Sequence, residues 1–178
     1  MPYPDPTIYD VVCPASLGTY YTDEVTATKL QINSGDPDLY ATMLRKVVPV
    51  DPGDLLKVHA FGRWTNDTGQ VTGVGWHLWI YNVDAGEGRT PDVWRLISPL
   101  CGENILPNGS MHHMPGQIFC MYRIPDDWPV GDRAVVVFRA SAHRTTGLTP
   151  TQYITVDKQY GALMIDRIRE SAAPPAAA

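Results

Sequence analysis

Two long segments alternate apolar side chains with a period of two residues, and this alternation constrains the fold more than any other feature of the chain. The apolar set of residues 54–65 is Leu56, Val58, Ala60, Gly62 and Trp64. That of residues 71–83 is Val74, Trp76, Leu78 and Ile80. Successive side chains of a β-strand point to opposite faces, so both segments are predicted to be strands with one face in a core. The turn-forming run Asn66-Asp67-Thr68-Gly69 lies between them and predicts a β-hairpin.

Further strands are predicted where proline and glycine bound short apolar runs. They are residues 24–32, 40–50, 93–98, 117–124, 133–144 and 160–169, with a short strand at 153–156. Two segments have a second interpretation, because residues 36–46 place Leu39, Met43 and Leu44 at roughly helical spacing and residues 160–170 fit neither period cleanly. Strands without helices between them predict an all-β fold, an antiparallel β-sandwich or jelly roll.

The length of 178 residues and the apolar share of 44% are those of one domain with a core. Residues 1–20 are expected to form an extended N-terminal arm, because Pro2, Pro4 and Pro6 prevent regular strand pairing. The sandwich is expected to occupy residues 21–170. Residues 171–178 contain only serine, alanine and proline, and we expect a disordered tail there.

A Gly-Asp pair precedes two of the predicted strands, at Gly53-Asp54 and at Gly131-Asp132. A nearby proline fixes φ, the glycine takes a positive φ, and the aspartate is expected to bond the backbone of the turn. The repeat is either an echo of two similar halves or the same turn chemistry used twice, and we favour the second interpretation.

Charge and cysteine content exclude several classes of protein. The formal charge is -5 and no run of Lys and Arg occurs, so neither nucleic acid nor an anionic membrane is an expected partner. No basic start with an apolar stretch marks a signal peptide, and no window reaches the ~18 apolar residues of a membrane helix. The three cysteines, Cys13, Cys101 and Cys120, have no disulfide or metal spacing, so we expect folding in a reducing cytosol with Cys120 buried.

Few residues suggest chemistry. His112-His113, near Cys101 and Met114, is the obvious metal candidate, but neighbours in an extended chain point opposite ways, so we expect an anchoring or surface role. The acidic residues at 84–88 and Asp126-Asp127 suit a catalytic pair, a calcium site or solvated loops, and we expect solvated loops. We therefore predict no catalytic residue, no metal site and no cofactor.

The second face of the predicted strands is also apolar, where a one-sided sheet would be polar. Either another part of the chain covers this face or it meets another subunit, because large exposed apolar patches are rare on monomers. The predicted subunit interface consists of Phe61, Trp79, Tyr81, Phe119, Met121, Val135 and Val137.

The order of turns and strands resembles a known group of proteins. The residues that carry the resemblance are Val48–Asp54, Thr65-Asn66-Asp67, Gly73–Trp76, Asn108-Gly109-Ser110 with His112-His113, Tyr122–Pro125 and Val156–Leu163. This pattern resembles the jelly-roll proteins of tailed-phage particles, of the capsid decoration and fibre-head types, and more distantly the C1q/TNF-like domains. It covers most of residues 40–168. The resemblance implies a homotrimer that binds a capsid lattice or a tail tip.

The expected function is therefore that of a capsid decoration protein on the virion surface, assembled in the bacterial host cytoplasm, with itself and the major capsid protein as partners. The residues of the arm expected to contact the capsid are Tyr3, Pro4, Pro6 and Tyr9. The alternative is a tail-fibre or carbohydrate-binding module, with Trp76, Trp79, Trp94 and Trp128 as stacking platforms. An enzyme using Asp126, Asp127 or Glu103 is disfavoured because no nucleophile–base pair is visible. A secreted C1q/TNF-like ligand is disfavoured by the missing signal.

Overall fold

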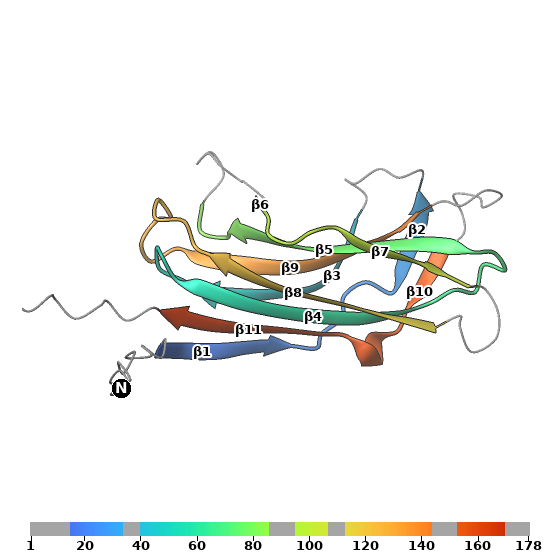
Figure 1. The fold of residues 1–178 in the computed structure, drawn as a ribbon, viewed down its shortest axis with the longest axis horizontal. Helices are drawn as coiled ribbons and strands as arrows, with labels where there is room; N and C mark the ends of the chain where they lie inside the picture. The colour runs from blue at the N-terminus through green and yellow to red at the C-terminus, as the bar shows by residue number, and fades with distance from the viewer. Residues whose placement is uncertain (1–14, 34–39, 86–94, 107–112, 144–152, 170–178) are drawn as a thin grey trace, which may run out of the picture.

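The computed structural model of the chain describes residues 15–33, 40–85, 95–106, 113–143 and 153–169 (Figure 1). Within them the secondary structure is almost entirely β. The elements are β1 (Ala15–Thr22), β2 (Lys29–Asn33), β3 (Ala41–Pro49), β4 (Leu55–Thr65), β5 (Thr72–Asn82), β6 (Arg95–Leu96), β7 (Cys101–Ile105), β8 (His113–Arg123), β9 (Arg133–His143), β10 (Tyr153–Val156), the 3-10 turn η3 (Lys158–Tyr160) and β11 (Ala162–Arg169). None of the described segments contains a helix that would span a membrane.

The strands form two layers. In sheet A the order is β1-β11-β4-β8, and all neighbours are antiparallel. In sheet B the order is β3-β9-β5-β7, again antiparallel, with β6 also beside β5. The short strands β2 and β10 join the layers at one end, because β10 pairs with both β2 and the end of β4, while β2 runs parallel to the end of β9. Figure 1 shows the two layers stacked on each other.

The pairing is nested along the chain. Strand β1 pairs with β11, β3 with β9, β4 with β8, and β5 with β7. The outermost strands of the sequence therefore pair together, and each following pair lies inside the previous one. A long antiparallel ribbon folded over in this way is a jelly roll, so the predicted fold class is confirmed.

The predicted hairpin between residues 54–65 and 71–83 is wrong. Strand β4 belongs to sheet A and β5 to sheet B, and the rings of Trp64 and Trp76 meet across the sandwich with centroids 4.9 Å apart. Alternation identifies which side chains of a strand share a face. It does not show whether the next strand pairs with it in the same sheet or lies in the opposite sheet. The turn between the strands is a corner held by buried Asn66, whose amide donates to the carbonyls of Gln70 (2.7 Å) and Ile105 (2.8 Å).

Both Gly-Asp turns have the predicted backbone. Gly53 and Gly131 have φ values of 82° and 88°, in the left-handed region that favours glycine. At the first turn the backbone N–H of Asp51 donates to Asp54 Oδ2 at 2.8 Å, as expected. The fully buried carboxylate of Asp54 also pairs with Arg167 and Arg169 at the end of β11. This ion-pair network joins the β3–β4 turn to the end of the neighbouring strand β11.

Several predicted boundaries differ from the observed ones. Of the predicted strand 24–32, only residues 29–32 are a strand, within β2. The helical interpretation of residues 36–46 is wrong for 41–46, which lie in β3. Strand β7 was not predicted because its polar, exposed sequence has no alternation. Strand β1 begins at Ala15, so the sandwich starts inside the segment expected to be an arm. Residues 1–14 and the predicted tail at 171–178 lie outside the described residues.

The tightest packing in the core lies beneath the β4–β8 pair. Trp64 is fully buried, and its ring lies against those of Trp76 (4.9 Å) and Phe138 (6.5 Å). Gly116 of β8 faces this cluster, and a Cβ there would lie 2.2 Å from Trp64 Cζ3. Gly62, directly opposite on β4, has room, because its Cβ would meet Phe138 Cε1 at 3.4 Å. The indole of Trp64 therefore requires glycine at position 116, whereas position 62 also has room for a Cβ atom.

This difference predicts that Gly116→Ala and Gly62→Ala have unequal effects on stability. Gly116→Ala should lower the free energy of unfolding by about 1–3 kcal/mol, because the Trp64 ring must move out of a close-packed core. Gly62→Ala should be neutral or slightly stabilising, because alanine restricts the unfolded chain. Urea denaturation of both variants measures the difference. Equal losses in the two variants would contradict the packing described here.

Candidate interaction surface

The outer face of sheet A has exposed apolar side chains on each of its four strands. One row runs from Tyr21 through Met164 and His59 to Phe119, from β1 to β8. The next row is Thr19, Asp166, Lys57 and Met121, and the third contains Phe61 and Gln117. These side chains point away from the core because their neighbours along each strand, such as Val58 and Ile165, point into it.

The large apolar side chains of this surface are exposed. Relative exposure is 60% for Phe119, 54% for Met121 and 50% for Tyr21. It is 40% for Met164 and 38% for Phe61. We call these five residues the apolar face. Since large contiguous apolar patches on isolated subunits are uncommon and often mark interaction sites, the apolar face is the candidate functional surface.

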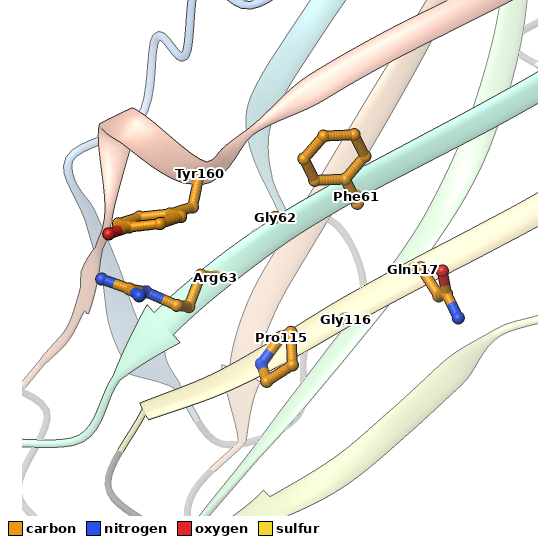
Figure 2. A pocket seen from close by; sticks show the side chains of 7 residues that line it. All are labelled: Phe61, Gly62, Arg63, Pro115, Gly116, Gln117 and Tyr160. Carbon is orange, nitrogen blue, oxygen red and sulfur yellow. The ribbon is translucent and has the colours of Figure 1, made fainter.

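A shallow hollow of about 360 Å³ lies at one end of the apolar face (Figure 2). Its walls are Phe61 and Arg63 from β4, Pro115 and Gln117 from β8, and Tyr160 from η3. The backbone of the paired residues Gly62 and Gly116 lies between these walls. The lining is thus largely aromatic and aliphatic, with Arg63 as its one charged side chain.

Arg63 is held in place by a stack and an ion pair. Its guanidinium carbon lies 3.3 Å from the centroid of the Tyr160 ring, and its Nε lies 2.6 Å from Asp157 Oδ2. Thr65 Oγ1 also donates to Asp157, and it lies 2.7 Å from His113 Nδ1. The carboxylate balances the charge of Arg63 and fixes the wall of the hollow before any ligand arrives. Such a site suits binding rather than catalysis.

The seven residues predicted as one subunit interface do not form one surface. Phe61, Phe119 and Met121 lie together on the apolar face. The other four lie on the outer face of sheet B, on the opposite side of the sandwich: Trp79, Tyr81, Val135 and Val137. Sequence periodicity places all seven opposite the core but does not assign them to a sheet.

Burial further separates the two groups. Trp79 and Tyr81 are half-buried, while Val135 and Val137 are only 2% and 1% exposed in the single chain. Val137 lies in register between Arg45 and Trp79. Little of either valine side chain is thus left for a contact with another subunit. An interface at Phe61, Phe119 and Met121 stays a prediction.

Three residues of the surface escaped sequence analysis. Tyr21 was missed because no strand was predicted over residues 15–22, most of which were assigned to the arm. Met164 and Tyr160 lie in the stretch 160–170, where neither period fits, because the 3-10 turn η3 interrupts the strand pattern. The proposed arm contacts Tyr3, Pro4, Pro6 and Tyr9 lie outside the described residues.

The tryptophans expected as sugar platforms are mostly internal. Trp76 and Trp128 are 7% and 8% exposed, and their indole N–H groups donate to the carbonyls of Gln117 and Asp132. Trp79 is half-buried on sheet B, and Trp94 lies outside the described residues. The two core positions remove the stacking surface that the carbohydrate-binding alternative requires.

The groups considered for chemistry occupy ordinary structural positions. Glu103 is exposed on β7, whereas Asp126 and Asp127 are exposed in the turn after β8. Asp84 is bonded by the side chain and backbone N–H of Arg133, which lower the pKa of Asp84 to about 2. Within the parts of the chain that the structure describes, no cluster of three potential metal ligands occurs.

The candidate metal-ligand and cysteine positions are likewise structural where they are described. His113 contacts Thr65, which fits the anchoring role expected for it, and His112 lies outside the described residues. Burial raises the pKa of the Cys120 thiol to about 11, which confirms its predicted place in the core and keeps it protonated near neutral pH. Cys101 is half-buried and not in a disulfide, and Cys13 lies outside the described residues.

The outer face of sheet B contains a buried histidine. His77 is 4% exposed, and its ring stacks on Tyr40 with centroids 4.2 Å apart. Its Nε2 atom has no hydrogen-bond partner among the residues that the structure describes. Burial, with a smaller contribution from the charge of Arg139, lowers the pKa of His77 to about 4. This histidine is therefore neutral in the folded protein at neutral pH.

The lowered pKa predicts that acid destabilises the protein through His77. The unfolded chain binds a proton near pH 6.5 and the folded chain only near 4, so this contribution to stability is present above 6.5 and is lost as pH falls from 6.5 to 4. Between pH 7 and pH 5 the loss should be about 2 kcal/mol.

Urea denaturation at the two pH values measures the loss. His77→Phe, which keeps an aromatic ring against Tyr40, should remove most of this pH dependence. His59→Phe on the apolar face serves as the matched control and should leave it in place. Part of the dependence will remain in both variants, because burial also lowers the pKa of His143. An unchanged pH dependence in His77→Phe would contradict the assignment.

Comparisons with known proteins identify the fold. No protein-family model and no curated protein matches the chain. Among solved structures, a chain of infectious bursal disease virus, Gx strain, superimposes with a TM-score of 0.53 at 10% identity, over 89% of this chain and 34% of that one. The Gt strain gives a TM-score of 0.51 at 13% identity, over 90% and 34% of the two chains.

A third match comes from T=1 particles derived from the infectious bursal virus, with a TM-score of 0.50 at 10% identity, over 90% of this chain and 37% of that one. This chain thus spans about a third of the length of the viral chains that it matches. At such low identity the likeness is one of fold alone. It supports the jelly-roll fold found for the described residues.

Proposed function

We propose that the chain is a structural protein of a virus particle and that it binds neighbouring subunits through the apolar face. The observation that carries this proposal is the register of Tyr21, Met164 and Phe119 across three strands of one open sheet face, with Met121 and Phe61 beside them. Removing apolar area of this kind from water is the main driving force of subunit association. The fold shared with chains from virus particles supports the same conclusion.

More specifically, we propose a capsid decoration protein of a tailed phage that acts as a homotrimer on the outer capsid lattice. The resemblance of the turn and strand order in residues 40–168 to tailed-phage jelly-roll proteins supports this assignment. Many copies, each burying apolar area across the joints between capsid subunits, would resist the pressure of packaged DNA. The partners are then other copies of the chain and the major capsid protein, at the capsid surface of particles assembled in the bacterial cytoplasm.

The proposal predicts that polar substitutions on the apolar face disrupt association. The double variant Phe119→Ser, Met121→Ser should be monomeric at micromolar concentration, where the natural sequence is oligomeric. Leu100→Ser is the matched control, because Leu100 is as exposed as Phe119 (59% against 60%) but lies outside sheet A. Light scattering measures the mass of each protein. A monomeric natural protein, or an oligomeric double variant, would contradict the role of this face.

A second measurement tests the capsid role directly. Purified protein should rebind phage particles stripped of it and raise their melting temperature, while the double variant should do neither. Failure of the natural protein to bind any shell would count against decoration and leave self-association as a separate result.

A further inference from the structure

We propose that the hollow beside Phe61 receives the proline-rich segment Pro2–Pro6 of a neighbouring copy. The inference rests on the proposed assembly of the chain and names the contact that links one copy to the next. It concerns two features that the apolar face alone does not explain. One is a shaped aromatic hollow, and the other is a proline-rich segment that precedes strand β1 of the same sheet in the sequence.

The hollow has the chemistry that favours proline. Its walls are the rings of Phe61 and Tyr160 and the ring of Pro115, and the charge of Arg63 is already balanced by Asp157. Aromatic-lined grooves bind proline-rich segments because the pyrrolidine ring is apolar and packs flat against an aromatic ring. A wall of this kind, with the charge of Arg63 already paired, gives no advantage to a charged ligand.

The hollow is also formed in advance. Tyr160 is held by its stack on Arg63, 3.3 Å from the ring centroid, and Arg63 is held by Asp157. Beneath the β4–β8 pair, the Trp64 indole packs against Gly116 and prevents the backbone there from moving inward. A ligand therefore does not have to order the walls, which reduces the entropic cost of binding.

The segment suits such a site. Residues 1–6 read Met-Pro-Tyr-Pro-Asp-Pro, so every second residue from Pro2 to Pro6 is a proline. Each proline fixes φ near the value of the polyproline II helix, and the segment loses little conformational entropy on binding.

Reach and direction favour a neighbouring copy. The chain enters sheet A at Ala15, which pairs with Arg169, whereas the hollow lies beside η3 at the opposite end of the sheet (Figure 1). The residues before Ala15 thus start from the end farthest from their own hollow. The eight residues 7–14 that join the segment to β1 span ~25 Å in an extended polyproline-type chain, no more than the ~26 Å length of the eight-residue strand β1. A return along β1 to its own hollow would use the whole of this length, whereas a copy packed beside this sheet edge lies within reach.

A labelled peptide of residues 1–12 tests the contact directly. Fluorescence anisotropy should show it binding to protein that lacks residues 1–12. Tyr160→Ala should weaken binding about tenfold, whereas the matched control Tyr153→Ala should change it less than twofold. Tyr153 has a comparable exposure (39% against 46% for Tyr160), and its ring lies under the ammonium group of Lys29, away from the hollow. Replacing the three prolines of the peptide by alanine should also weaken binding about tenfold. No binding, or equal binding to both tyrosine variants, would overturn the inference.

A mixing experiment tests whether the contact joins two copies. Full-length Tyr160→Ala has the segment but a damaged hollow, and protein lacking residues 1–12 has the hollow but no segment. Sedimentation velocity should show that each alone associates less than the natural protein and that their mixture forms a new complex. A mixture without a new complex would place the segment on its own chain and overturn the inference.

The mixing experiment also separates this inference from the proposed function. If the truncated protein associates as strongly as the natural one, the segment has no part in assembly, while association through the apolar face stands. If the natural protein does not associate at all, the proposed assembly fails as well. Circular dichroism melts of the variants exclude loss of folding as the cause of either result.

Discussion

The contact between Trp64 and Trp76 across the two sheets is the interaction on which the rest of the structure depends. It sets sheet A against sheet B at the corner where the chain crosses from β4 to β5. It also requires glycine at position 116, which brings β8 close over the indole rings. Because β4 and β8 are fixed side by side in this way, their outward side chains share one surface. The apolar face and the hollow are both consequences of how the core is packed.

The two outer faces of the sandwich differ in how far their apolar side chains are buried. On sheet B the valines of β9 are buried, and Tyr40 stacks on His77, so much of that face is closed within one subunit. On sheet A, Phe119 and Met121 remain more than half exposed in the described structure. The same period-two pattern thus gives buried outward side chains on sheet B and exposed ones on sheet A. The outer face of sheet A is therefore the candidate surface for a partner, whereas the outer face of sheet B contributes to the stability of the single subunit.

The long strands were predictable because strict alternation over eleven residues has no helical equivalent, and β4, β5 and β9 follow the predicted segments within a residue or two. The Gly53 and Gly131 turns were predictable because their chemistry is local. Strand partners were not, since β4 pairs with β8 and β11 through contacts distant in sequence. Because strand partners could not be predicted, the seven residues expected to form one subunit interface were not separated into those of sheet A and those of sheet B. Phe61 and Trp79 look equivalent along the chain and differ only in the sheet that contains them.

On the proposed assembly, the apolar face and the proline segment act together. Each side chain of the face is already partly buried, so the area left for a partner gives only a modest contact. A segment that docks on the same neighbour makes the second contact intramolecular, and the two combine at a high effective concentration. Because the segment is joined to edge strand β1, its docking also fixes which edge of one subunit faces the next. The linked contacts would therefore determine orientation as well as affinity, which a flat apolar surface alone does not do.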